Sequence, residues 1–203
     1  MTSLKLFVLA ALGTLAAGCV PATANRDGLS TSTAATPPPT APNPSVGGAA
    51  MLSERDVVAN ASAAPNLTML VRAVRSAGLA PTLSGPGPFT VFAPTNDAFG
   101  RLAPGTVDNL LRAENRASLI RVLNYHVVSG ALTAAQLRQR VQAGAGTATL
   151  TTVAGDTLTA TLENGVVALT DTNGTKSYVE TPDVRQSNGV VHVINGVLVP
   201  RLG

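Results

Sequence analysis

The sequence predicts an α+β domain, with helices in the first half of the folded region and strands in the second. Three observations support this fold class. Apolar residues recur at helical spacing up to residue 137, they alternate with polar residues from residue 157 onward, and turn-forming segments separate the runs. Helices followed by a run of antiparallel strands favour an α+β domain over a doubly wound parallel sheet.

The helical segments are marked by caps and by apolar spacing. Ser53 and Asp56 form a capping-box-like start, and Gly78 ends the helical run that follows. Thr133 with Gln136 caps a later helix that continues through Leu137. The apolar residues at helical spacing are Leu67, Leu70, Val71 and Val74, then Val107, Leu110 and Leu111, and then Leu119, Ile120, Val122 and Leu123.

The strands are marked by β-branched and alternating runs between turns. An apolar strand over residues 89–93 follows the turn-rich residues 84–88 and ends at Pro94. Further along the chain, Asn164-Gly165 supplies the positive φ of a hairpin turn. The remaining predicted elements are strands at 157–162 and 166–169, a turn at 171–174, and a terminal hairpin in which Asn195-Gly196 joins 190–194 to 197–199.

The N-terminal residues have the features of an export signal. An apolar run over residues 6–12 is too short to span a bilayer, and small residues follow it. Residues 15–18 before Cys19 resemble the lipobox of bacterial lipoproteins. Residues 1–18 are therefore predicted to be a lipoprotein-type signal peptide, with lipidation at Cys19. Ala22-Thr23-Ala24 offers an alternative cleavage after residue 24, which would give a soluble secreted or periplasmic protein.

A Pro/Thr/Ala-rich linker is predicted to separate this signal from the folded domain. Residues 19–50 contain almost no large apolar side chains and cannot build a core, so we expect a disordered spacer. Prolines stiffen such a segment toward extended geometry. Residues 51–203 then form the domain, held in the cell envelope by the lipid, at the outer membrane in a Gram-negative bacterium.

Composition excludes several functional classes. The net charge is only +3, from 14 Lys and Arg against 11 Asp and Glu, and 3% of the residues are aromatic, so we expect no nucleic-acid partner. One cysteine excludes internal disulfides and multi-thiolate metal sites. No catalytic or phosphate-binding motif occurs, so we predict no catalytic residues and no cofactor. A metal site could draw only on His126 and His192 with Asp97 or Asp183, and we expect none.

Three segments together resemble one known family. Residues 89–99, FTVFAPTNDAF, resemble the first signature block of the fasciclin (FAS1) domain, and residues 188–200, NGVVHVINGVLVP, resemble the second. Tyr125-His126-Val127-Val128 resembles the Tyr-His motif between them. The resemblance implies a bacterial secreted or lipoprotein member with a twisted β-wedge or sandwich packed against a layer of helices. It also implies extracellular adhesion without a catalytic centre.

The motif residues divide into two predicted groups. Those expected to specify the fold are Thr95, Asn96, Asp97, Phe99, Asn188, Gly189 and His192. By resemblance, the residues expected to take part in partner binding are Tyr125, His126 and the pair Asp183-Val184. For Tyr125 and His126 a structural role competes with this one, because a phenol and an imidazole at the end of a helix can tie it to a strand.

The predicted function is a non-catalytic adhesion or interaction module of the cell surface or envelope. Its expected partner is a protein or polysaccharide of the cell surface or matrix, with the membrane contacted only through the N-terminal lipid. The alternative is an envelope carrier of a lipid or small apolar ligand, because one helical face is apolar and consists of Leu67, Leu70, Val71 and Val74. Core packing is the competing explanation for that face.

Overall fold

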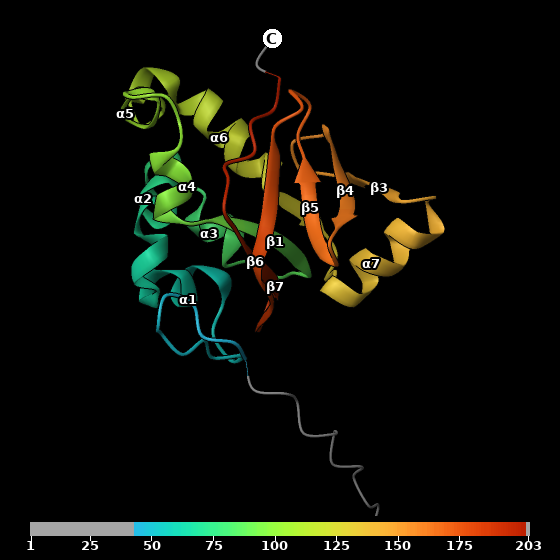
Figure 1. Ribbon diagram of the computed structural model, residues 1–203. Helices are drawn as coiled ribbons and strands as arrows, with labels where there is room; N and C mark the ends of the chain where they lie inside the picture. Colours follow the sequence, from blue (N-terminus) through green and yellow to red (C-terminus); the bar gives the residue numbers. More distant parts are fainter. Residues whose placement is uncertain (1–42, 202–203) are drawn as a thin grey trace, which may run out of the picture. The chain divides into compact units, whose positions relative to one another are not determined.

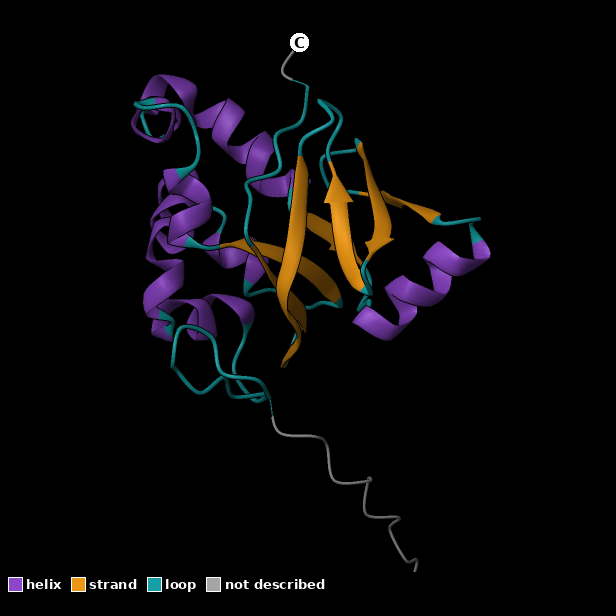
Figure 2. Ribbon diagram, in the orientation of Figure 1, coloured by secondary structure: helices purple, strands orange, loops and turns teal. Residues whose placement is uncertain are grey.

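A seven-stranded mixed sheet forms the centre of the computed structural model, which describes residues 43–201 (Figures 1 and 2). The strand order is β2-β1-β7-β6-β5-β4-β3. Only β1 and β7 pair in parallel, and the other neighbours are antiparallel. The strands are β1 (Phe89–Pro94), β2 (Val127–Ser129), β3 (Thr147–Thr151), β4 (Thr157–Glu163), β5 (Val166–Thr170), β6 (Lys176–Gln186) and β7 (Gly189–Ile194).

The two outer strands of the sheet come close enough to bond. Val153, just after β3, donates its N–H to the carbonyl of Val127 in β2 at 2.8 Å, and Val128 forms a bridge with Thr152. The sheet is therefore strongly curved and nearly closed, which limits the length of unpaired edge. This arrangement is the β-wedge that the family resemblance implies.

The helices lie mainly on one side of the sheet, where α2 and α6 pack against each other, while α7 lies apart against β3, β4 and β5 (Figure 1). The helices are α1 (Val57–Ala63), α2 (Thr68–Ala77), α3 (Ala80–Leu83), α4 (Asn96–Gly100), α5 (Thr106–Leu110), α6 (Arg116–Tyr125) and α7 (Ala134–Ala143), with 3₁₀ turns η1 (Pro65–Leu67) and η2 (Ala113–Asn115). The α+β class is therefore confirmed.

The core has two main parts, one on each face of the central strands. Val191 and Val193 of β7 belong to the cluster under the helices, whereas Ile194 belongs to the cluster between the strands and α7. In β1, Val91 belongs to the cluster under the helices and Phe92 belongs to the cluster between the strands and α7. Both faces of these strands are buried, which explains their nearly continuous apolar sequence.

Several local predictions are confirmed. Gly78 adopts the left-handed conformation (φ 72°) that ends α2. The Thr133 and Gln136 pair forms a complete capping box at the start of α7. Asn164 and Gly165 have φ values of 51° and 80°, and they connect β4 to β5 as a two-residue turn.

The first helical run is shorter and more divided than predicted. The helix cap is Asp56, not Ser53, and its Oδ1 accepts a hydrogen bond from the Ala59 N–H at 2.8 Å. Helix α1 ends before Ala64, whose ψ of 115° is extended. Pro65 explains this break, because the residue before a proline is disfavoured in the helical region.

The predicted terminal hairpin is wrong. Residues 197–199 form no strand, because β7 already pairs with β1 on one edge and with β6 on the other. Asn195 bonds to β6 instead. Its N–H donates to the Tyr178 carbonyl at 3.1 Å, and its Oδ1 accepts from the Tyr178 N–H at 2.9 Å.

The folded part extends before residue 51, where the predicted linker would end. Val46 is buried in the cluster under the helices. The Asn43 side chain pairs with the backbone of Arg185, donating to its carbonyl at 2.7 Å and accepting from its N–H at 2.9 Å. The predicted signal peptide, Cys19, the cleavage after residue 24 and the linker up to residue 42 lie outside the described residues.

Candidate functional site

The first signature block connects β1 to two helices. Thr95 follows β1, and its Oγ1 accepts from the Ala98 N–H at 3.2 Å, which caps α4. Asn96 reaches α2, where its Oδ1 accepts from the Met69 N–H at 3.0 Å. Asp97 is exposed in the first turn of α4, and the half-buried Phe99 packs against the core under the helices.

Asn188, in the second block, joins three segments that are distant in the sequence. Its Nδ2 donates to the Leu83 carbonyl at 2.7 Å and to the Gly85 carbonyl at 3.1 Å. Its Oδ1 accepts from the Val57 N–H, the first residue of α1, at 3.2 Å. One side chain therefore fixes the start of α1, the end of α3 and the loop before β1.

Gly189 is required by close packing of backbone against backbone. It lies opposite Phe89 in the parallel β1–β7 pair. A Cβ at position 189 would lie 2.1 Å from the Phe89 carbonyl oxygen, which cannot move without breaking the ladder. Only glycine lets the two strands begin side by side at this point.

Tyr125 connects the end of α6 to the strand layer. The side chain is fully buried. Its hydroxyl donates to the Thr157 carbonyl at 2.8 Å and accepts from the Thr172 N–H at 3.2 Å. The phenol therefore pairs two backbone groups, at the start of β4 and in the turn after β5.

His126 is also internal, and its two bonds define its charge state. Nδ1 lies 2.8 Å from the Val122 carbonyl, and Nε2 accepts from the Leu198 N–H at 3.0 Å. An acceptor at Nε2 and a carbonyl at Nδ1 require the neutral tautomer with its proton on Nδ1. Burial lowers the pKa of His126 to about 4, although the Val122 carbonyl and Asp171 act in the opposite direction.

His192 and Asp183 form a second internal network at the start of α7. The His192 Nδ1 accepts from the Asp183 N–H at 3.2 Å, and Nε2 lies 2.8 Å from the Leu132 carbonyl, to which it donates. The Asp183 carboxylate accepts from the Ala134 N–H at 2.7 Å. Asp183 itself has a φ of 58° at an irregularity of β6. Burial lowers the pKa of His192, which favours its neutral form.

The four residues predicted by resemblance for partner binding are not grouped on the surface. Tyr125, His126 and Val184 are 0%, 2% and 1% exposed. Asp183 is half-buried. Among residues 43–201, no hydrogen bond joins the Tyr-His pair to Asp183 or Val184. The three buried side chains can therefore contribute to binding only indirectly, by stabilising the conformation of exposed residues.

The second signature block reaches the surface in an open groove of about 610 Å³, which we call the motif groove. The Thr90 hydroxyl holds the neighbouring loop, because it accepts from the Leu132 N–H at 2.8 Å and donates to the Gly130 carbonyl at 2.5 Å. The groove is lined by Pro86, Gly87, Pro88, Ala131, Arg185, Gln186, Ser187, Asn188, Gly189 and Val190.

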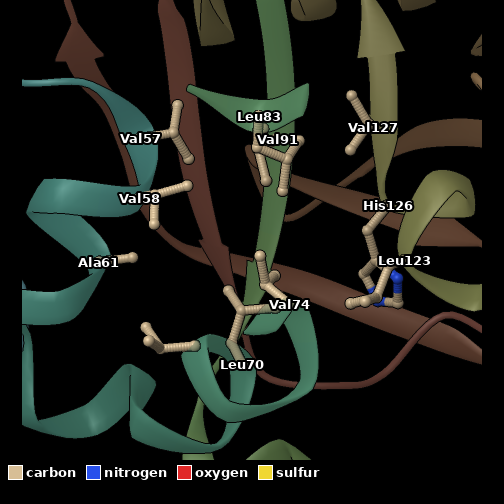
Figure 3. A pocket seen from close by; sticks show the side chains of 11 residues that line it. Val57, Val58, Ala61, Leu70, Val74, Leu83, Val91, Leu123, His126 and Val127 are labelled. Atoms are coloured by element: carbon tan, nitrogen blue, oxygen red, sulfur yellow. The ribbon is translucent and has the colours of Figure 1, made fainter. Parts of the chain in front are cut away.

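The apolar face considered for a ligand carrier is part of the core. Leu67, Leu70 and Val74 are buried between α2 and the strands. The apolar cavity that Leu70 and Val74 line together with His126 has a volume of about 30 Å³ (Figure 3). That volume is far below the roughly 300 Å³ of a small-molecule pocket. The geometry therefore favours core packing over ligand carriage.

No cluster of three or more His, Cys, Asp or Glu side chains that could hold a metal ion is present among residues 43–201. Within the same range, no helix combines the length and apolarity needed to cross a membrane.

The fold and these contacts define a class of protein: a helix-covered, curved β domain whose motif residues tie the backbone together beneath an open groove. Comparisons identify the family. The Fasciclin domain model matches residues 65–200, and the chain belongs to that family.

Two relatives and one solved structure show the range of similarity. The chain is 44% identical over 152 residues to Protein sll1483 of Synechocystis sp., covering 75% of this chain and 77% of that one. It is 38% identical over 133 residues to transforming growth factor-beta-induced protein ig-h3 of Sus scrofa, covering 66% and 17%. A FAS1 domain pair from the insect cell adhesion molecule fasciclin I matches with a TM-score of 0.63 at 21% identity, covering 73% and 51%. The last match shows the fold alone.

Sequence reasoning missed a second surface feature, on α2. Arg72 and Arg75 are exposed and line a groove of about 360 Å³ between α1 and α2. The signal was present in the sequence, because residues 68, 72, 75 and 76 share one helix face, and that face is polar. Apolar periodicity does not reveal this feature, because that pattern describes the opposite, buried side of the helix.

Proposed function

We propose that this protein is a non-catalytic adhesion or interaction module that binds a cell-surface or matrix protein at the motif groove. The observation that carries the proposal is the position of Asn188 and Gly189, which line the groove while the same residues lock the fold beneath it. Membership of the Fasciclin domain family supports a general adhesion or interaction role. Members of this family are generally adhesion proteins without enzymatic activity.

A rigid floor makes this groove suitable for recognition. At the base of the motif groove, the Asn188 side chain forms hydrogen bonds with the backbone of three residues. Asp183 and His192 form hydrogen bonds with the backbone of the neighbouring residues 132–134. A partner that binds a preorganised surface loses less free energy to ordering of loops. In this proposal Tyr125, His126 and Val184 contribute to binding indirectly, by keeping the domain rigid.

The proposal is tested by blocking the groove. Ala131 is exposed at its rim, and Ala131→Arg would place a long charged side chain there without touching the core. The matched control is Ala143→Arg, at the exposed C-terminal end of α7, where a positive charge suits the helix dipole.

The assay is saturable capture of purified surface and matrix proteins by the full chain on beads. We expect Ala131→Arg to reduce capture of the partner by at least about tenfold, which corresponds to about 1.4 kcal/mol. We expect Ala143→Arg to leave capture unchanged. Equal capture by both variants would refute a binding role for the motif groove.

The proposed location is the cell envelope, with attachment through a lipid on Cys19 and a spacer made by the residues that follow. The small residues before Cys19 support the lipid attachment, and the proline-rich composition after it supports the spacer. We expect the wild-type chain to enter the detergent phase on phase separation and Cys19→Ser to stay in the aqueous phase. A mature N-terminus at Asn25 would instead establish the alternative cleavage and a soluble secreted or periplasmic protein.

A further inference from the structure

The exposed face of α2 contains a second groove, between α1 and α2, which we call the arginine groove. Its volume is about 360 Å³, and it is open to solvent. Arg72 and Arg75 are three residues apart on one helix, so their side chains emerge from the same face. The groove is lined by Ser62, Thr68, Val71, Arg72, Arg75 and Ser76.

The two guanidinium groups are free to bind an external anion. Among residues 43–201, neither Arg72 nor Arg75 forms a salt bridge, and the two salt bridges of this part of the chain lie elsewhere. No Asp or Glu lines the groove. A third guanidinium adds positive charge at the end of α2, where Arg116 donates to the Ala77 carbonyl at 3.2 Å and 3.3 Å.

We infer that the arginine groove binds an acidic polysaccharide through its carboxylate or sulfate groups. Guanidinium groups bind such anions through paired N–H donors. The Ser62 and Thr68 hydroxyls donate to the Val58 carbonyl and to the Asn96 Oδ1, so toward a sugar they act as acceptors, whereas the Ser76 hydroxyl in the same groove can donate or accept. The inference names a second partner class for the proposed adhesion function, on which it rests. It needs no contribution from the motif groove.

The composition of the groove favours a polysaccharide over other polyanions. The large exposed apolar residues of the described chain are Leu52, Val153 and Val166, and none of them lines the groove, so nothing there would insert into a lipid bilayer. No aromatic side chain lines it either, although protein hot spots and single-stranded nucleic acids both depend on such residues. Val71 is the one apolar side chain of the lining, and it is buried, so charged and hydroxyl groups form the accessible part of the groove, which suits a hydrated, anionic sugar chain.

The test measures binding of the full chain to polygalacturonate, with neutral dextran as the uncharged comparison. The variant Arg72→Gln/Arg75→Gln removes both guanidinium groups. The matched control, Arg138→Gln/Arg140→Gln, removes the same charge from exposed positions on α7, which lies apart from α2 across the sheet (Figure 1). All four arginines are exposed, so we expect the melting temperatures of both variants to stay within about 2 °C of wild type.

We expect the α2 variant to bind polygalacturonate about tenfold more weakly and the α7 control to change affinity less than about twofold. We expect Arg72→Lys/Arg75→Lys to retain only part of the affinity, because an ammonium group lacks the planar pair of donors. Wild-type binding should weaken as salt rises.

Three outcomes would overturn the inference. Equal losses in the α2 and α7 variants would show attraction by net charge instead of a site. Binding to phosphatidylglycerol vesicles but not to polygalacturonate would assign the groove to lipid headgroups. Absence of binding to any acidic polymer would exclude the arginine groove as a polysaccharide-binding site. If the substitution Ala131→Arg still reduces capture of a surface protein in any of these cases, the proposed function stands and only this inference fails.

Discussion

Lowering the pH from 7 to 5 should destabilise the protein through His126. In the folded state this imidazole is neutral, because Nε2 accepts the Leu198 N–H and Nδ1 donates to the Val122 carbonyl. Burial lowers its pKa from 6.5 to about 4. The unfolded chain therefore binds a proton first as the pH falls, so the stabilisation is complete above pH 6.5 and is lost progressively down to pH 4.

The magnitude follows from the two pKa values. A pKa of 6.5 in the unfolded chain and about 4 in the folded one gives a total of about 3 kcal/mol. About 2 kcal/mol of this is lost by pH 5, before most carboxylates titrate. His192 should add to the loss in the same direction, because burial also lowers its pKa.

The assay is urea unfolding at pH 7 and pH 5 for wild type and His126→Gln, an uncharged variant that keeps one donor and one acceptor. We expect the wild type to lose about 2 kcal/mol more than the variant between these pH values. His192 is present in both proteins, so its contribution cancels in the comparison.

A second measurement decides the matter if the variant does not fold. The chain contains only two histidines, so their imidazole proton resonances can be followed by NMR during titration. We expect the His126 resonance to keep its neutral chemical shift down to pH 5. A midpoint near pH 6.5 in the folded protein would refute the reasoning, as would equal pH dependence in wild type and variant.

Two further predictions concern backbone geometry. Asp183→Ala should cost about 2 kcal/mol of unfolding free energy, because it removes the acceptor for the Ala134 N–H and places alanine at a φ of 58°. Asp183→Asn should cost less than half as much, and equal losses in urea unfolding would contradict this account. Gly189→Ala should cost at least about 3 kcal/mol, because its Cβ would lie 2.1 Å from the Phe89 carbonyl oxygen. The control Gly100→Ala has open space around it and should stay within about 0.5 kcal/mol, so comparable thermal shifts for both would argue against a steric requirement at position 189.

Local signals in the sequence were sufficient for most of the individual elements. The capping box at Thr133, the C-terminal glycine at position 78 and the hairpin turn at residues 164–165 each depend on residues within one turn of each other. Such features are encoded by neighbouring side chains, so a single sequence reveals them. The same holds for β1, whose apolar run is bounded by prolines at positions 88 and 94.

Long-range pairing could not be predicted in this way. Strand β6 was missed because Pro182 and the left-handed Asp183 interrupt its alternation, although it is the longest strand described. The predicted hairpin after β7 failed for a related reason. The segment around Asn195-Gly196 carries a turn signal, but the parallel partner of β7 comes from residues about one hundred positions earlier, and that pairing leaves no free edge.

The candidate site shows the same division between local and distant information. The family blocks identified residues that matter, yet the side chains of Tyr125 and His126 turned inward, where each satisfies two polar groups of the protein itself. A buried polar group without a partner costs about 1–3 kcal/mol, so these positions are constrained by the fold whatever the protein binds. The blocks therefore identify the scaffold. Exposed residues such as Ala131, Arg72 and Arg75 carry no such constraint, and partner choice is expected to depend on residues of that kind.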